Sequence, residues 1–350
     1  MAEPRIYLDH AATTPILPEA RAAMTAALDA WHNPSSPHAE GRAAKAALEQ
    51  SRRRIAEALG WSGSVIFTSG ASEALAIALG RGKGDGRFVS AVEHDAVFRA
   101  APDAVLLPMD GDGRLLTDGI GGSRPVVAVQ HANNETGIVQ PLGEIAAIVR
   151  AKGGLLVADC AQTAGKLPLP DADMIAISAH KFGGPPGVGA LLVRDLGMIE
   201  AVGGQEQGYR PGTQNLPGMS AMCAALEASS EWMRQAIELR VYLERMLRES
   251  GAEVIGASSL RIPTIGAYRM PGVPANAQLI QFDLAGIAVS AGSACSSGSL
   301  KPSHVLSAMG WPAQAASEVI RVSFGRNSNA AEVDRFAAFW LRLAARRRAA

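Results

Sequence analysis

Cysteine is scarce in this sequence, and the positions of the few cysteines are informative. The 350 residues include three cysteines, Cys160, Cys223 and Cys295, and no two of them form a C-x-x-C pair. This spacing argues against a disulfide framework and against a structural zinc site. We therefore expect no metal ion, and we expect that any cysteine with a task in this chain works as a free thiol.

The sequence also lacks long apolar runs, excess charge and internal repeats. It has no uncharged stretch as long as a transmembrane helix, and its first residues lack the basic-then-apolar pattern of a signal peptide. Lys plus Arg and Asp plus Glu both number 33, so the formal net charge is zero. This balance does not point to nucleic acid or to an anionic membrane. The sequence predicts a cytoplasmic protein with no nucleic-acid and no membrane partner.

Apolar residues make up 48% of the chain, enough to fill two hydrophobic cores. Strand-like apolar runs alternate with helical stretches such as residues 142–152, which is typical of an α/β fold with a mostly parallel sheet and helical crossovers. We predict a large domain over residues 16–234 and a smaller α+β domain from residues 1–15 and 235–350, with one helical stretch from about 217 to 250. The strand-like runs lie at residues 65–68, 88–91, 126–130, 155–158, 173–177 and 190–193.

A lysine follows one of these strand-like runs at the point where the strand must end. The run at 173–177 continues into Ser178, Ala179, His180 and Lys181 and then breaks into glycines and prolines, which cannot continue a strand. The stem of Lys181 is therefore fixed while its amine faces a loop-lined cleft, as a Schiff-base lysine requires. Taken alone, this pattern is more often a surface lysine at a turn.

Polar residues gather after several successive strands of the predicted sheet. Ligands of open α/β sheets bind outside the carboxyl ends of the strands. Taken singly, Asp159 would more often be a helix cap and His94 a hydrogen-bonded structural residue. Five such residues in successive units indicate a built site instead: they are His94, Asn134, Asp159, Gln162 and Lys181.

The segment Ser69–Gly70–Ala71–Ser72–Glu73 joins the strand at 65–68 to an apolar helix expected at 74–79. Such a turn exposes backbone amides at the positive end of a helix dipole, which favours a phosphate. An ordinary capping box, in which Ser69 or Ser72 closes the helix, fits the segment equally well. We call a phosphate site at residues 69–73 the phosphate cup. Together with Lys181 and Asp159, it predicts pyridoxal phosphate, a cofactor whose ring nitrogen is kept protonated by an acidic partner.

Several motifs in register resemble those of the class V aminotransferase superfamily, and two resemble the cysteine desulfurases of the NifS/IscS type within it. The similarity runs in order from about residue 6 to 326. The superfamily motifs are YLDHAATT (7–14), NPSSPH (33–38), TSGASE (68–73), HANNETG (131–137) and SAHK (178–181), and the desulfurase motifs are SAGSACS (290–296) and IRVSFGR (320–326).

The resemblance implies a fold-type I pyridoxal-phosphate enzyme that takes sulfur from L-cysteine and leaves L-alanine. It assigns Lys181 as the Schiff-base lysine and Asp159 as the partner of the pyridine nitrogen. The other assignments are Gln162 and Asn134 on the ring-hydroxyl side, Ala71, Ser72, Ser178 and His180 for the phosphate, His94 stacked on the ring or acting as acid or base, and Arg321 with Asn134 for the substrate. Thr213 matches a residue that reaches the phosphate of the neighbouring subunit, which implies a homodimer.

In the implied reaction, the Cys295 thiolate attacks the substrate sulfur and forms a persulfide that is passed to an acceptor protein, such as an iron–sulfur scaffold. Gly292 and Gly298 flank Cys295 among small residues, a composition suited to a carrier loop. We expect Cys160 and Cys223 to be idle. The chain lacks the longer tail of some relatives, so whether it docks to a scaffold through its C-terminus stays open at this point.

Three other readings remain open. A selenocysteine lyase or an aminotransferase on the same scaffold would use Lys181 and Asp159 in the same roles, but a transaminase has no need of Cys295. An inactive scaffold subunit could lose Lys181, Arg321 and Cys295, and the chain has all three. A metal hydrolase built on His94, His131, Asp159 and His180 is disfavoured, because Lys181 would be a poor neighbour for a cation.

Overall fold

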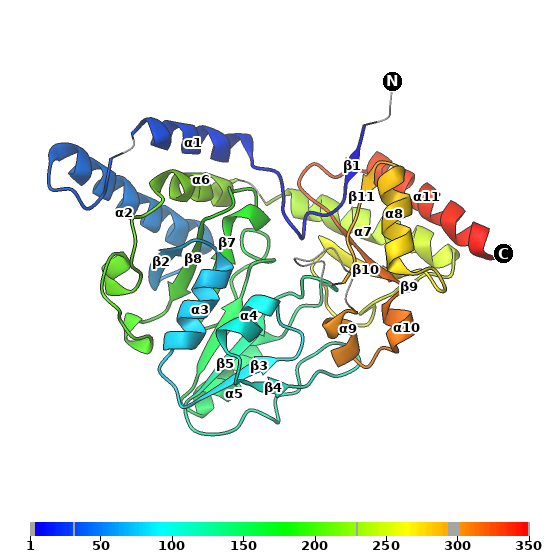
Figure 1. Cartoon of the computed structure of the whole chain (residues 1–350), viewed down its shortest axis with the longest axis horizontal. Helices are drawn as coiled ribbons and strands as arrows, with labels where there is room; N and C mark the ends of the chain where they lie inside the picture. The colour runs from blue at the N-terminus through cyan, green and yellow to red at the C-terminus, as the bar shows by residue number, and fades with distance from the viewer. Residues whose placement is uncertain (1–3, 31, 229, 293–301, 349–350) are drawn as a thin grey trace.

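The computed structural model of the chain describes residues 4–30, 32–228, 230–292 and 302–348. Its strands form a large sheet and two small ones, which lie in separate parts of the molecule (Figure 1). Cys295 lies outside the described residues. None of the helices in those residues has the length and apolar character needed to cross a membrane.

The large sheet has seven strands in the order β2-β8-β7-β6-β5-β3-β4. Strand β8 is antiparallel to both of its neighbours, and the other pairs are parallel, so the mostly parallel sheet predicted from the sequence is confirmed. The strands span Ser64–Thr68 (β2), Gly86–Ser90 (β3), Val105–Leu107 (β4), Pro125–Gln130 (β5), Leu155–Asp159 (β6), Met174–Ser178 (β7) and Gly189–Val193 (β8).

Helices cover both faces of this sheet. Successive side chains of each strand point to opposite sides, so apolar residues on both faces need to be covered. Phe67 packs in the cluster that contains Ile55, whereas its neighbour Ile66 packs with Leu75 on the other face. Every residue of β5, β7 and β8 is buried, which explains why these strands read as continuous apolar runs. The covering helices are α1 (Pro18–Asp29), α2 (Ala39–Leu59), α3 (Ala71–Arg81), α4 (Asp95–Ala100), α5 (Leu142–Ala151) and α6 (Leu216–Glu227).

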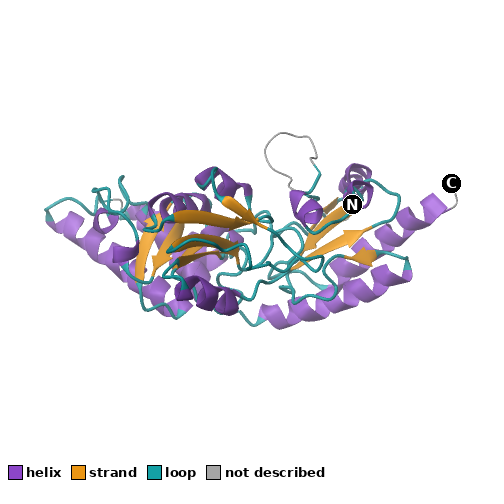
Figure 2. Ribbon diagram, turned by 90° about the horizontal axis from the view of Figure 1, so that it is seen from below, coloured by secondary structure: helices purple, strands orange, loops and turns teal. Residues whose placement is uncertain are grey.

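The remaining strands build a smaller α+β part, with long helices along one side of its sheet (Figure 2). Strand β10 (Ile265–Arg269) pairs antiparallel with β9 (Glu253–Val254) and β12 (Val319–Ser323). Strand β1 (Ile6–Tyr7) pairs parallel with β11 (Ile287–Ala288). This pairing ties the N-terminal arm, residues 4–15, to the smaller part. Its helices are α7 (Trp232–Glu249), α8 (Ala275–Leu284), α9 (His304–Ala308), α10 (Ala313–Ala316) and α11 (Ala330–Arg348).

The smaller part has a core of its own, in which the rings of Phe282 and Phe336 stack at 4.8 Å beside the buried Trp340. Ile6 and Leu8, near the start of the chain, pack into this core. On this basis we propose the domain division expected from the sequence, with residues 16–234 as the large domain and residues 1–15 and 235–350 as the small one.

Two local expectations were wrong. The helical stretch predicted from 217 to 250 is two helices, α6 and α7, because the backbone adopts an extended conformation at Ala228, where ψ is 139°. Helix α3 begins at Ala71, three residues before the predicted start, with Gly70 as its N-cap and no side-chain cap. The alternative interpretation, a capping box in which Ser69 or Ser72 closes the helix, is therefore not what the structure shows. Instead, Glu73 Oε2 accepts a hydrogen bond of 2.5 Å from the backbone amide of Ser69.

Candidate active site

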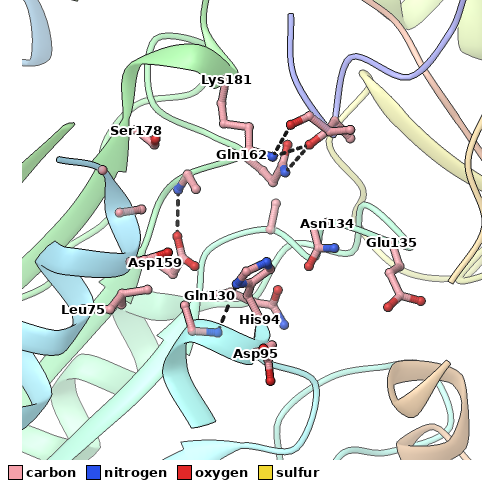
Figure 3. Close-up of a pocket in the computed structure, with 18 of the residues that line it drawn as sticks. Leu75, His94, Asp95, Gln130, Asn134, Glu135, Asp159, Gln162, Ser178 and Lys181 are labelled. Atoms are coloured by element: carbon pink, nitrogen blue, oxygen red, sulfur yellow. Dashed lines mark hydrogen bonds between the residues drawn. The ribbon is translucent and has the colours of Figure 1, made fainter. Parts of the chain in front are cut away.

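A cavity of about 910 Å³ lies at the carboxyl edge of the large sheet, where the small part closes over it. In Figure 3, Lys181 and Gln162 lie on one side of this cavity, and Asp159, His94 and Asn134 are seen on the other. The structure thus brings together residues that are more than 200 positions apart. The predicted site residues that line the cavity are Ala71, Ser72, His94, Asn134, Asp159, Gln162, Ser178, His180, Lys181 and Arg321.

Lys181 closes a short 3₁₀ turn, Ala179–Lys181, that follows β7 directly. Its Nζ atom donates hydrogen bonds to the backbone carbonyl oxygens of Ala11 at 2.6 Å and of Ala12 at 2.8 Å. The N-terminal arm therefore fixes the position of this amine. The end of β7 holds the backbone of Lys181, and the N-terminal arm holds its amine.

The N-terminus of α3 opens into the same cavity. The first amides of a helix have no acceptor within the helix, and Ala71 and Ser72 supply two of them. Strand β8 approaches this turn so closely that a Cβ atom added to Gly189 would lie 2.7 Å from Gly70 Cα. The Ser178 hydroxyl lies near the same turn, 3.5 Å from where a Cβ on Gly70 would be. Free amides, a hydroxyl and the helix dipole together fit an anionic group such as a phosphate.

Asp159 ends β6 and is buried at the floor of the cavity. Its Oδ1 atom accepts a hydrogen bond of 2.8 Å from the amide of Ala161. Burial raises the pKa of this carboxyl, while the hydrogen bond and the nearby His94 and Lys181 act in the opposite direction. A carboxyl in this state gains from a cationic partner, because an opposite charge would offset its desolvation.

Gln162 leaves one polar atom of the cavity without a partner. Its Nε2 atom donates a hydrogen bond of 2.9 Å to Ala11 O. Its Oε1 atom is buried and has no donor among the described residues. Because an unsatisfied buried acceptor is costly, this atom fits a ligand that presents a hydroxyl or an N–H group.

His94 caps helix α4, and this contact fixes its tautomer. Its Nδ1 atom accepts a hydrogen bond of 3.2 Å from the amide of Ala96, so the neutral ring carries its proton on Nε2. Burial lowers the pKa of His94, which favours this neutral form. His180 is neutral as well: burial first and then Lys181 lower its pKa to about 4, and its Nδ1 atom lies 3.2 Å from Thr13 Oγ1.

Arg321 lies on β12, and its side chain is only 7% exposed. Its Nη1 atom donates a hydrogen bond of 2.8 Å to Asn134 O, and its Nη2 atom donates one of 2.7 Å to Asp9 Oδ1. A buried guanidinium that lines a cavity suits a carboxylate ligand, since its N–H groups can bind both oxygens.

The sequence analysis missed several groups that shape this cavity. Gln130 and Glu135 line it, and Glu135 accepts a hydrogen bond of 2.6 Å from the Ser303 hydroxyl. His304 lines it too, with Nε2 2.9 Å from Glu93 O. Glu135 belongs to the HANNETG motif, so the motif could have flagged it. Asp9, Ala11 and Ala12 line the cavity as well and belong to the YLDHAATT motif, but only the path of the N-terminal arm shows that they reach it.

Two predicted site residues are not among those that line this cavity. Thr213 is exposed and does not line the cavity, and Cys295 lies outside the described residues. Cys160 and Cys223 are buried in the large part, where burial raises the pKa of both thiols, that of Cys223 to about 11. In the described parts of the chain, no cluster of His, Cys, Asp and Glu could hold a metal ion, and His131 contacts Thr163 instead of the cavity.

Comparisons with known proteins agree with this geometry. The family model for "Aminotransferase class-V" matches residues 6–336, so the chain belongs to the class V aminotransferase family. Several curated relatives of the chain are named as cysteine desulfurases. The cysteine desulfurase of Cereibacter sphaeroides is 37% identical over 95% of this chain and 93% of that protein. The putative cysteine desulfurase IscS 1 of Bacillus subtilis is 35% identical over 94% and 96%.

Solved structures give the same grouping. A NifS-like protein from Rickettsia africae superimposes with a TM-score of 0.89 and 29% identity, over 97% of this chain and 99% of that one. The structure described as SspA in complex with cysteine gives a TM-score of 0.80 and 27% identity, over 91% and 98%. The fold-type I architecture expected from the motifs is therefore confirmed.

Proposed function

We propose that this chain is a pyridoxal-phosphate-dependent cysteine desulfurase, which removes sulfur from L-cysteine and gives L-alanine and a persulfide on Cys295. One observation carries the proposal. Of the cofactor and substrate residues predicted from the sequence and described by the structure, all but Thr213 line a single cavity. Relatives named cysteine desulfurases, and a neighbour in complex with cysteine, support L-cysteine as the substrate.

The cavity fits the proposed cofactor at three points. The free amides of α3 and the Ser178 hydroxyl suit its phosphate, the Asp159 carboxyl suits its ring nitrogen, and the unpartnered Gln162 Oε1 suits a donor on the ring. When bound, the cofactor supplies an electron sink for the bonds of the substrate Cα atom. Neutral His94, with its proton on Nε2, is proposed to stack on the ring.

The residues of the chain then divide the work on the substrate. Arg321 and Asn134 are proposed to bind the substrate carboxylate, which orients the Cα proton toward Lys181. The Lys181 amine is proposed to hold the cofactor and, once freed, to take that proton as a general base. Its contacts to Ala11 O and Ala12 O provide a second resting place on the wall of the cavity.

Sulfur transfer is proposed to pass through Cys295. The thiolate attacks the substrate sulfur, the carbon–sulfur bond breaks, and the sulfur stays on the enzyme as a persulfide. Cys160 and Cys223 are poor candidates, since their raised pKa values favour the thiol form. Delivery to an acceptor protein such as an iron–sulfur scaffold, the homodimer implied by Thr213 and the cytoplasmic location stay predictions.

The test is an absorbance spectrum of the purified protein, combined with an assay of L-alanine release from L-cysteine. We expect a visible cofactor band that changes when L-cysteine is added and that is lost in Lys181→Ala. Cys295→Ser should keep the band and lose alanine release, whereas Cys223→Ser serves as the matched control and should keep both. A colourless protein that takes up no pyridoxal phosphate would refute the proposal. Full alanine release by Cys295→Ser would refute the persulfide step alone and favour another reaction on the same scaffold.

A further inference from the structure

Arg321 is held at two of its three side-chain nitrogen atoms by neighbours within the protein. Asn134 O accepts from Nη1 and Asp9 Oδ1 accepts from Nη2, at 2.8 Å and 2.7 Å. The third nitrogen, Nε, is buried and has no acceptor among the described residues. The structure therefore leaves a fixed guanidinium with one buried donor to satisfy.

The carboxylate of Asp9 is itself held in place by the N-terminal arm. Strand β1 pairs with β11, and Asp9 then forms a parallel bridge with Ser323, two residues after Arg321 on β12. The Tyr7 hydroxyl donates a hydrogen bond of 3.1 Å to Asp9 O. The side chain of Asp9 is 21% exposed and lines the cavity beside Arg321. The backbone of Asp9 is thus held in place at the point where its carboxylate meets Arg321.

The remaining N–H groups of Arg321 define what it can bind. A guanidinium has five N–H groups in one plane, and a carboxylate binds best across two parallel ones. The Nε–H group needs an acceptor, and a carboxylate that accepts from Nε takes its second bond from the adjacent Nη nitrogen. This arrangement works only if the plane of the guanidinium is held at the right angle to the cavity, because binding depends on orientation.

We propose that Asp9 is a positioning residue for substrate recognition, which holds the Arg321 guanidinium so that Nε and an adjacent Nη nitrogen face the carboxylate of an α-amino acid. The inference rests on the proposed function, in which Arg321 binds that carboxylate. Asp9 makes no bond to the substrate in this arrangement. Its charge offsets the cost of burying Arg321 but also repels the incoming carboxylate, so its two effects on binding oppose each other. Because Arg321 is buried and depends on neighbours to hold its orientation, the support from Asp9 outweighs this repulsion.

The test compares a substrate that has the carboxylate with one that lacks it. The holoenzyme is assayed with L-cysteine and L-cysteinamide, and binding of L-alanine and L-alaninamide is measured by calorimetry. In Asp9→Ala, the preference for the acid over the amide should fall about tenfold, the loss expected when one hydrogen bond to a charged group no longer positions its partner. Asp9→Asn keeps an acceptor oxygen for Nη2 and should retain most of the preference.

The control is Asp283→Ala, which breaks the exposed pair between Arg5 of the N-terminal arm and Asp283 of α8 and should leave the preference unchanged. An equal loss with acid and amide in Asp9→Ala would mean a general structural role and would overturn the proposal. So would an unchanged or increased preference, which would mean that the repulsion dominates, or a failure of Asp9→Asn to retain it. If the wild type neither turns over L-cysteine nor binds L-alanine, the proposed function has failed, and that result is distinct from these.

Discussion

Gln162 Nε2 and Lys181 Nζ donate to the same acceptor, the carbonyl oxygen of Ala11, at 2.9 Å and 2.6 Å. Two side chains from the turns that follow β6 and β7 thus hold the N-terminal arm at one point. The arm in turn carries Asp9 to Arg321. The cofactor side and the substrate side of the cavity are therefore linked through a backbone segment of a few residues.

Gln162→Ala tests this link. The variant loses both the contact to Ala11 O and the buried Oε1 acceptor, so we expect the affinity for pyridoxal phosphate to fall roughly tenfold, the effect of one or two hydrogen bonds. The measurement is a titration of the apoprotein, followed by the visible absorbance of the cofactor. Gln235→Ala is the matched control, because Gln235 donates to Ser328 O at 3.1 Å outside the cavity. Equal affinities for Gln162→Ala and the wild type would contradict the assigned contact.

Glu93 makes stability depend on pH. Burial raises its pKa from 4.5 to about 8, against the hydrogen bonds from the Ser90 hydroxyl and the Gln130 amide. Because the folded pKa lies above the unfolded one, the folded state binds the extra proton between these values. Stability from this group is fully present below about pH 4.5 and is lost as the pH rises through about 8.

Glu93→Gln keeps an acceptor oxygen for Ser90 and Gln130 but cannot ionise. We expect the variant to match the wild type near pH 5 and to exceed its free energy of unfolding at pH 8 by a few kcal/mol, the order that a shift of this size allows. Thermal melting across this pH range measures the difference. If the two proteins lose stability in parallel as the pH rises, Glu93 is not the group responsible.

The strand-end side chains could be predicted from the sequence because the rule behind them is local. A parallel strand that ends in Asp159, or in a short turn closed by Lys181, delivers that side chain to the same edge of the sheet, whatever the distance along the chain. The break between α6 and α7 could not be predicted, because no glycine or proline separates these two helices and only the extended backbone at Ala228 shows where the first one ends.

The contacts of the N-terminal arm were also beyond the sequence. Asp9 and Arg321 are 312 residues apart, and an ion pair between them follows from the pairing of β1 with β11. The acceptors at Ala11 and Ala12 are backbone carbonyls, which every residue has, so no residue type marks them. Motifs identify side chains with chemistry, but they do not report which backbone atoms hold those side chains in place.

Two neighbouring arginines of α2 provide a test of buried against exposed ion pairs. Arg52 contacts Glu206 at 2.8 Å, and the Glu206 side chain has no exposed surface. Arg54 contacts Glu227 at 2.6 Å, but both of these side chains are more than a third exposed. Arg52→Ala leaves a buried carboxylate without its main partner and should lower the free energy of unfolding by about 3–5 kcal/mol. Arg54→Ala should cost about 1 kcal/mol or less.

Denaturant unfolding of both variants measures this contrast. Glu206 also accepts from the Phe67 amide at 2.8 Å and from Gln214 at 3.2 Å, so it anchors the loop that carries Thr213. Equal and small losses for the two variants would mean that water reaches Glu206 once Arg52 is removed.

The contact between β8 and Gly70, in the turn that precedes α3, gives the last prediction. A Cβ atom on Gly189 would meet Ile177 O and would lie 2.7 Å from Gly70 Cα, so the strand and the turn must separate to accept it. We expect Gly189→Ala to lower the free energy of unfolding by about 1–3 kcal/mol, the usual cost of overpacking. Because the movement displaces the turn before Ala71 and Ser72, the affinity for pyridoxal phosphate should fall as well.

Gly143→Ala is the matched control for this substitution. Gly143 is exposed in helix α5, and a Cβ atom there would meet nothing within 4 Å. The same chemical change should therefore stabilise the protein by up to about 1 kcal/mol, because alanine favours a helix over glycine. Thermal unfolding and cofactor titration are measured on both variants. A Gly189→Ala protein with unchanged stability and cofactor affinity would mean that the close approach of β8 does not shape the phosphate cup.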